Sequence, residues 1–141
     1  MELRQVFDDL VRFETDLWNQ IDARLREQTD VTLGALNVLM VIDGTPSCRV
    51  QDIAAALSIT VGGASQAVDR LERIGYCART PNAADRRSSL LELTTAGDQA
   101  LLRAGQVFDR ELDARLARPL STPALSQLAH ALAVLRSAQN A

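Results

Sequence analysis

The chain has 141 residues, of which 47% are hydrophobic and 23% charged, and its formal net charge at pH 7 is −3. This length and composition suit one compact domain and argue against a disordered chain. No apolar run approaches the roughly 20 residues of a membrane span. Residues 1–10 lack the basic and apolar segments of a secretory signal, so we expect a cytoplasmic protein.

Cysteine and histidine are scarce in this chain. Two cysteines and one histidine, His130, are too few for a disulfide framework or a histidine-rich metal site. A mixed zinc site of cysteine, histidine and carboxylate ligands stays open in principle, but no C-x-x-C or H-x-x-x-H spacing favours one. We therefore expect no metal and no cofactor, and interpret His130 as an exposed or interface residue.

The charge is unevenly distributed along the chain. Residues 1–48 carry four arginines against nine acidic residues, residues 49–90 carry six against four, and residues 91–141 carry five against five. Every basic residue is arginine and lysine is absent, a bias that genome composition can cause. A cationic centre between acidic or neutral ends is a usable indication of nucleic-acid contact.

The first two predicted elements are helices. Between residues 3 and 25 the apolar positions recur at steps of three, four and seven, which is the spacing of a long amphipathic helix. A second helix is predicted from Thr32, a plausible N-cap, to Gly44. Its run LNVLMVI is apolar on nearly all sides, so we expect this helix at the centre of the core.

Two short helices follow. They are predicted over residues 50–57 and 61–74, with a tight turn at residues 58–60 between them. Gly75 is expected to end the second of these helices in the left-handed conformation. The pair therefore forms a helix-turn-helix.

A hairpin and two further helices complete the chain. The predicted elements are strands over 76–80 and 89–93 around the polar stretch PNAADRRS, a helix over 95–116 capped by Thr94 or Thr95 and closed by Pro119, and a helix from Ser121 or Thr122 onward. The apolar stripes of the terminal helices exceed what a monomer of this size needs. We expect these stripes to pack against a second copy of the chain.

Two short helices joined by a three-residue turn, followed by a hairpin with arginines at its tip, describe a winged helix-turn-helix within a mainly α fold. In this arrangement the second helix presents its first residues to base edges in the DNA major groove. The hairpin tip, or wing, can place an arginine in the narrower minor groove, where the negative potential is strong.

The segment IAAALSITVGGASQAVDRLERIGYCAR and the later segment DRRSSLLELTTAG resemble the DNA-binding core of the MarR family of bacterial transcription regulators. The order and length of the helices agree with this family from end to end. The residues that match the family's motifs are Leu71, Gly75, Tyr76 and Arg79 before the wing, and Asp85, Arg86, Arg87, Leu90, Leu93, Thr94 and Gly97 in and after it.

The resemblance implies a homodimer whose first, fifth and sixth helices interlock. Residues 1–30 and 98–141 would be the dimerisation helices, and residues 31–97 the winged helix-turn-helix region. The dimer would bind an inverted repeat in double-stranded DNA, with half-sites about one helical turn, ~34 Å, apart. The expected function is that of a ligand-responsive repressor.

Family members commonly hold a small aromatic or phenolic effector between the dimer helices and the winged region. Phe13 and Trp18, on the first predicted helix, are weak candidates to line such a pocket. At helical spacing, core or dimer packing is the alternative explanation for both side chains.

The expected base contacts lie at the start of the recognition helix, residues 61–74. The candidates are Thr60, Gly62, Gly63, Ser65 and Gln66. Gln66 suits a bidentate contact with adenine, at a position where many family members carry a basic residue, although it could also be a solvated helix residue. Two adjacent glycines cost a helix roughly 1 kcal/mol each relative to alanine. They indicate either a close approach of the backbone to DNA or an irregular helix start.

The arginines supply the expected backbone contacts. Arg87 is expected in the minor groove, oriented by a carboxylate–guanidinium pair with Asp85, and Arg86 at a phosphate. Further candidates for phosphate contacts are Arg49, Arg70 and, more weakly, Arg73. Arg79 is interpreted either as a brace of the hairpin or as a DNA contact.

Three other functions compete with DNA-binding regulation. An enzyme is not expected, because the chain has no nucleophile–base pair, carboxylate pair or phosphate loop. A winged-helix dimer serving only as a protein-interaction module would lack the steep salt dependence of a DNA binder. A thiol-based redox sensor would use Cys48, whose pKa the adjacent Arg49 could lower, or Cys77. The redox branch of the family places its cysteine near the N-terminus, where this chain has none.

Overall fold

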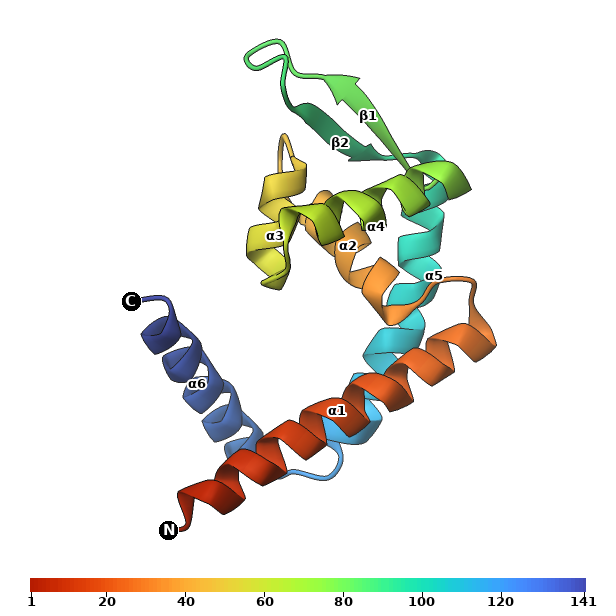
Figure 1. Ribbon diagram of the computed structural model, residues 1–141. Helices are drawn as coiled ribbons and strands as arrows, with labels where there is room; N and C mark the ends of the chain where they lie inside the picture. Colours follow the sequence, from red (N-terminus) through yellow and green to blue (C-terminus); the bar gives the residue numbers. More distant parts are fainter. The chain divides into compact units, whose positions relative to one another are not determined.

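The computed structural model describes residues 1–141 and confirms a mainly helical chain with one two-stranded hairpin (Figure 1). The elements are α1 (Leu3–Gln28), α2 (Leu33–Gly44), α3 (Val50–Leu57), α4 (Val61–Ile74), β1 (Cys77–Pro81), β2 (Ser89–Leu93), α5 (Thr95–Leu112), the π-helical segment η1 (Asp113–Ala117) and α6 (Thr122–Gln139). They form two compact units, Met1–Val107 and Phe108–Ala141. None of the helices combines the length and the apolar character needed to cross a bilayer.

The core of the first unit is built around α2. Leu36 and Leu39 of this helix have no exposed surface, and α1, α3, α4 and β2 all contact it. The side chains that these neighbours bury are Ile21, Leu25, Ile53, Ala64, Val68, Leu71 and Leu91. Each large apolar side chain buried in this way contributes roughly 1.5–3 kcal/mol of transfer free energy. The prediction that α2 is central is confirmed.

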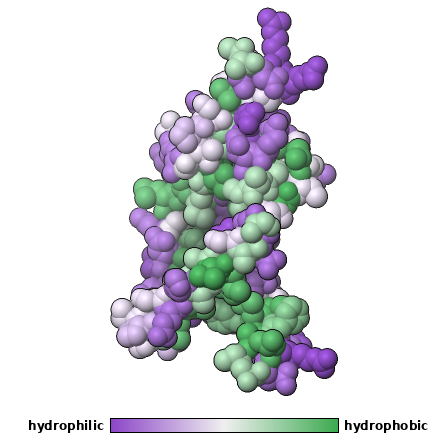
Figure 2. All heavy atoms as spheres, turned by 90° about the vertical axis from the view of Figure 1, so that its left-hand side faces the viewer, coloured by the Kyte–Doolittle hydropathy of each residue, from purple (hydrophilic) through white to green (hydrophobic).

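Only the C-terminal half of α1 takes part in this core. Ile21 and Leu25 are buried, whereas the apolar side chains of the N-terminal half are exposed. The exposed ones are Leu3, Val6, Phe7, Leu10, Val11 and Phe13. Figure 2 shows that hydrophobic residues reach the surface of the molecule. An amphipathic helix thus presents part of its apolar face to solvent in the single chain.

Capping side chains set the ends of the helices where the sequence predicts them. Thr32 and Ser121 each accept a hydrogen bond from the backbone N–H three residues further on. Gly75 ends α4 in the left-handed region with φ 95°, as predicted. Ser58, the residue that ends α3, adopts the same region with φ 55°, so a serine takes a conformation that glycine adopts more readily.

The wing is an antiparallel hairpin in which Cys77 pairs with Leu93 and Pro81 with Ser89. Its first strand begins one residue later than predicted. Tyr76 lies outside the ladder because its N–H donates to the carbonyl oxygen of Leu71 at 2.9 Å, in the last turn of α4. The wing therefore starts directly from the end of the recognition helix.

The sheet has a third contributor that the sequence does not reveal. Cys48, in the turn between α2 and α3, forms an isolated bridge with Leu91, whose N–H donates to the Cys48 carbonyl oxygen at 2.8 Å. A two-stranded hairpin alone is marginal in water. This bridge attaches β2 to the helical core.

Thr94 is the residue that caps α5. Its hydroxyl accepts a hydrogen bond from the N–H of Gly97 at 3.0 Å and donates to the carbonyl oxygen of Gly75 at 2.6 Å. Its own N–H donates to the carbonyl oxygen of Tyr76 at 3.1 Å. The Leu-Thr-x-x-Gly motif therefore joins the start of α5 to the end of α4.

The second unit holds the last residues of α5, η1 and α6. The helix predicted to continue to residue 116 is α-helical only to Leu112, after which Asp113–Ala117 is π-helical. The N–H of Arg118 reaches the carbonyl oxygen of Asp113 at 2.9 Å, and Pro119 has no N–H with which to continue the ladder. No residue of α6 is buried, and Leu135 is 53% exposed.

Candidate nucleic-acid interface

At about 100° per residue, the recognition helix α4 has a buried face and an exposed face opposite it. Ala64, Val68 and Leu71 are buried against the core. The face opposite the core is a stripe of partly or fully exposed residues at steps of four, three and four. Its members are Gly62, Gln66, Asp69 and Arg73. Of the predicted base contacts, Gly62 and Gln66 therefore share the face that is free to meet a ligand.

The N-terminus of α4 is regular and capped. The hydroxyl of Thr60 accepts the N–H of Gly63 at 3.0 Å, so this predicted DNA contact is also the N-cap of the helix. A β-carbon on Gly62 would meet nothing within 4 Å, whereas one on Gly63 would lie 3.1 Å from the Thr60 hydroxyl oxygen. The irregular helix start that the sequence left open is not what the structure shows. The fold itself does not need a glycine at position 62.

Arg79 attaches the wing to the recognition helix. From β1 its guanidinium contacts the carboxylate of Asp69 at 2.7 Å and that of Glu72 at 3.5 Å. The sequence left open whether Arg79 braces the hairpin or contacts DNA, and the structure shows it bracing the hairpin. The contact has an electrostatic consequence, because it neutralises two acidic side chains of α4 that would otherwise repel phosphates.

The wing tip is organised by side chains that bond to its own backbone. Asp85 accepts the backbone N–H of Arg87 at 3.0 Å, and Asn82 accepts that of Ala84 at 3.0 Å. The expected carboxylate–guanidinium pair between Asp85 and Arg87 is absent, so Asp85 acts on the backbone of Arg87 rather than on its side chain. Both bonds span two residues, as in Asx turns. Asn82 is a residue whose role the sequence analysis missed, although this turn chemistry could have indicated it.

The arginines differ in their availability. Arg86 and Arg87 are exposed at the wing tip and make no ion pair. Arg49 lies at the N-cap of α3, where its backbone N–H donates to Asp52 at 2.9 Å and its guanidinium lies 3.7 Å from the same carboxylate. Arg86 and Arg87 are thus the cations of the wing with no internal partner.

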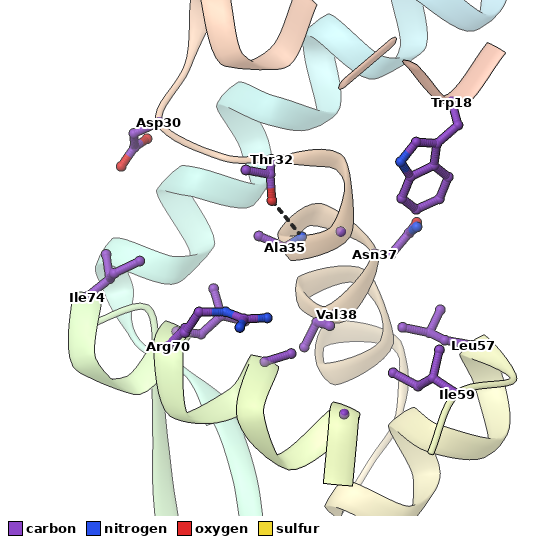
Figure 3. Close-up of a pocket in the computed structure, with 14 residues that line it drawn as sticks. Trp18, Asp30, Thr32, Ala35, Asn37, Val38, Leu57, Ile59, Arg70 and Ile74 are labelled. Atoms are coloured by element: carbon purple, nitrogen blue, oxygen red, sulfur yellow. Dashed lines mark hydrogen bonds between the residues drawn. The ribbon is translucent and has the colours of Figure 1, made fainter. Parts of the chain in front are cut away.

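The side chain of Arg70 lies apart from the exposed face of α4 and from the wing. Figure 3 shows its side chain reaching from α4 toward Val38 of α2, into a pocket of about 530 Å³. The pocket lies between α1, α2 and α4, with Trp18 at one end and Asp30 at the other. Its remaining lining residues are Thr32, Gly34, Ala35, Asn37, Leu57, Ile59, Gly63, Ala67, Leu71 and Ile74. Of the two predicted pocket residues, Trp18 lines this cavity and Phe13 does not.

Both cysteines are inside the protein. Burial raises the pKa of the Cys48 thiol, to which Asp52 adds, so the adjacent Arg49 does not activate it. Burial is also the main cause that raises the pKa of Cys77 to about 11. A thiolate is the reactive form of cysteine, so neither site has the character of a redox sensor. No group of three or more potential metal ligands is found.

Comparison with known proteins finds one family. Residues 31–89 match the model of the MarR family. Among curated proteins, the transcriptional regulator BilQ of Clostridium symbiosum is 28% identical over 82 residues, covering 58% of this chain and 57% of that protein. The multiple antibiotic resistance protein MarR of Escherichia coli is 27% identical over 103 residues, covering 73% of this chain and 72% of that protein. The chain spans about three-fifths of the length of the first curated relatives that it matches.

Comparison with solved structures finds a similar fold over nearly the whole chain. Sco3205, a MarR family regulator from Streptomyces coelicolor solved in complex with DNA, has a TM-score of 0.89 at 20% identity. The match covers 96% of this chain and 86% of that one. At this identity the likeness establishes the winged-helix fold, while the sequence match over residues 31–89 adds the family. The chain belongs to the MarR family.

Proposed function

We propose that this protein is a DNA-binding transcription regulator that acts as a homodimer on an inverted repeat. The observation that carries the proposal is the pairing of two exposed features, the Gly62–Gln66 face of α4 and the unpaired Arg86 and Arg87 of the wing tip. Arg79 braces one to the other. A helix and an adjacent cationic hairpin suit the major groove and the neighbouring minor groove.

The family and its relatives support this function over an enzymatic one. Curated relatives such as BilQ are named as transcriptional regulators, and Sco3205 was solved with DNA. In this chain the arginines of the α4 end and the wing would supply phosphate contacts, with Gln66 reading a base edge. Arg87 would enter the minor groove, and the candidates for phosphate and sugar contacts are Arg49, Ser65, Arg73 and Arg86.

Dimerisation would cover the apolar surface that the terminal helices expose. The N-terminal half of α1 leaves Phe7 68% exposed, and α6 buries none of its residues. Exposed apolar side chains gathered on one helix mark interaction sites in soluble proteins. We propose that residues 1–30 and 98–141 form the dimer interface, which would set the spacing of the two recognition helices.

We propose that the pocket lined by Trp18 and Arg70 is the binding site of an effector. Trp18 offers an aromatic wall and Arg70 a cation that makes no ion pair, so a small aromatic or phenolic compound with an acidic group suits it. Because α4 forms one wall, an effector that binds better to a dimer with altered helix spacing would release DNA. We propose repression by occupation of a promoter, relieved by this effector.

The first experiment is a selection of binding sequences from random double-stranded DNA, followed by anisotropy titrations of the selected DNA at several salt concentrations. We expect an inverted repeat with half-sites about one helical turn, ~34 Å, apart, and an affinity that falls steeply with salt. Absence of enrichment with weak, salt-insensitive binding would refute the proposal in favour of a protein-interaction module. Repeating the selection after unfolding and refolding removes the influence of a ligand that co-purifies.

A further inference from the structure

Tyr76 joins three parts of the first unit that are far apart in the sequence. Its hydroxyl donates a hydrogen bond to one carboxylate oxygen of Asp30, in the segment between α1 and α2. The other oxygen of Asp30 lies 3.6 Å from the guanidinium of Arg103 on α5. We name these three side chains, Tyr76, Asp30 and Arg103, the wing tie.

The backbone of Tyr76 is held as firmly as its side chain. Its N–H donates to Leu71 of α4, and its carbonyl oxygen accepts the N–H of Thr94, the residue that follows β2. Tyr76 therefore stands where the recognition helix, both strands of the wing and the start of α5 meet.

From these contacts we infer that Tyr76, Asp30 and Arg103 are positioning residues, which hold the wing in the orientation that lets its tip contact DNA. The inference rests on the proposed DNA-binding function. None of the three needs to touch DNA itself, because each would act through the direction in which the wing leaves α4. Arg79 would hold the same hairpin further along β1.

The length of the wing explains why its root matters. β1 has five residues, which at about 3.3 Å per residue place the tip roughly 16 Å from Tyr76. A tilt of about 10° at the root would move the tip by roughly 3 Å, about the length of one hydrogen bond. A small loosening at Tyr76 is thus enough to misplace Arg87.

The hydrogen bond between Tyr76 and Asp30 shifts the pKa values of both side chains. The hydrogen bond from Tyr76 lowers the pKa of Asp30, and the same bond raises the pKa of Tyr76. Tyr76 is the one tyrosine of the chain. Its ionisation can therefore be followed by absorbance without interference from other phenols.

The test uses the full-length protein and the DNA selected above. Tyr76→Phe removes one hydroxyl and is expected to weaken DNA binding about three- to tenfold. Asp30→Ala should have the same effect, and the double variant should be no weaker than either single one. Asp30→Asn keeps an acceptor for the hydroxyl and should restore part of the affinity. Asp30→Ala should also lower the pKa of Tyr76 toward its ordinary value.

A matched control distinguishes positioning from a general loss of stability. Thr29→Val removes a neighbouring hydroxyl whose hydrogen bonds, to the carbonyl oxygens of Leu25 in α1 and of Val31, reach neither the wing nor α5. This variant should lower the unfolding free energy without changing the DNA affinity of the folded protein. An equal loss of affinity in Thr29→Val and Tyr76→Phe would overturn the inference.

Combination with the wing tip provides the decisive comparison. If Tyr76 acts through the wing, Tyr76→Phe has no further effect once Arg87→Ala has removed the minor-groove contact. Additive losses in the double variant would overturn the inference and leave the proposed function intact. A wild-type protein that binds no DNA would instead refute the proposed function, and the inference with it.

Discussion

Gly97 and Tyr76 are packed backbone to backbone. A β-carbon on Gly97 would lie 1.9 Å from the carbonyl oxygen of Tyr76 and 2.9 Å from its carbonyl carbon. Since both atoms belong to the main chain, a side chain at position 97 would force α5 away from the root of the wing. The glycine of the Leu-Thr-x-x-Gly motif is therefore a requirement of packing.

Gly97→Ala should lower the free energy of unfolding by at least about 2 kcal/mol, measured by denaturant titration, because overpacking against backbone cannot relax through a rotamer change. Gly105→Ala, on the same helix, is the matched control. A β-carbon there meets nothing within 4 Å, so this variant should be about 0.5–1 kcal/mol more stable. Similar changes in the two variants would contradict the packing argument.

Gly62→Ala separates folding from function at the start of α4. The substitution meets no obstacle in the fold and should stabilise the protein by up to about 1 kcal/mol. If the backbone approaches DNA at this position, the same variant should bind its operator more weakly. Gly105→Ala again serves as the control for the gain in stability. Unchanged DNA affinity in Gly62→Ala would remove this residue from the interface.

Gln66→Ala should relax the preference at one base pair of each half-site by about 1–3 kcal/mol. The measurement is a set of anisotropy titrations on operators changed one base pair at a time. Arg73→Ala, on the same exposed face, should instead weaken binding to all of these sequences alike. A uniform loss for Gln66→Ala would reassign its side chain to the DNA backbone.

Arg87→Ala should weaken binding to most sequences and reduce the slope of log affinity against log salt by about one. Unchanged affinity would show that the wing assignment is wrong.

The contact between Asp85 and the Arg87 N–H makes a separate prediction. Asparagine can accept the same hydrogen bond, so Asp85→Asn should retain the affinity for DNA, whereas Asp85→Ala should lose part of it. Equal losses in both variants would favour a role for the carboxylate charge.

Cys77 should resist modification in the folded protein. Its pKa is raised to about 11 by burial, so at pH 8 a thiol reagent should react at the rate at which the protein opens. A raised pKa also means that the protonated thiol stabilises the fold below the ordinary value of 9.0 and that this stability is lost as pH rises toward 11. The difference between wild type and Cys77→Ala in unfolding free energy should shrink by about 2 kcal/mol over that interval. A constant difference would contradict the shift.

The helix ends that the sequence predicted correctly depend on interactions between residues close together in the chain. Thr32 and Ser121 start helices and Gly75 ends one because each acts on backbone groups within a few residues. The contacts that position the wing were not predictable in this way. Tyr76 and Asp30 are 46 residues apart, and no periodicity relates them. The position of the Arg70 side chain was not predictable either. Whether it lies on the exposed face of α4 or in the pocket depends on how α2 packs beside α4.

The bridge between Cys48 and Leu91 divides the wing into a stiff and an adaptable part. The N–H of Leu91 should exchange with solvent deuterium more slowly than any amide near the tip, because opening it requires β2 to leave the helical core. Beyond this bridge the loop around Asn82 and Asp85 is held by bonds to itself. Minor grooves differ in width with sequence. A hairpin that is anchored at its base and compliant at its end can follow those differences while its arginines stay in register.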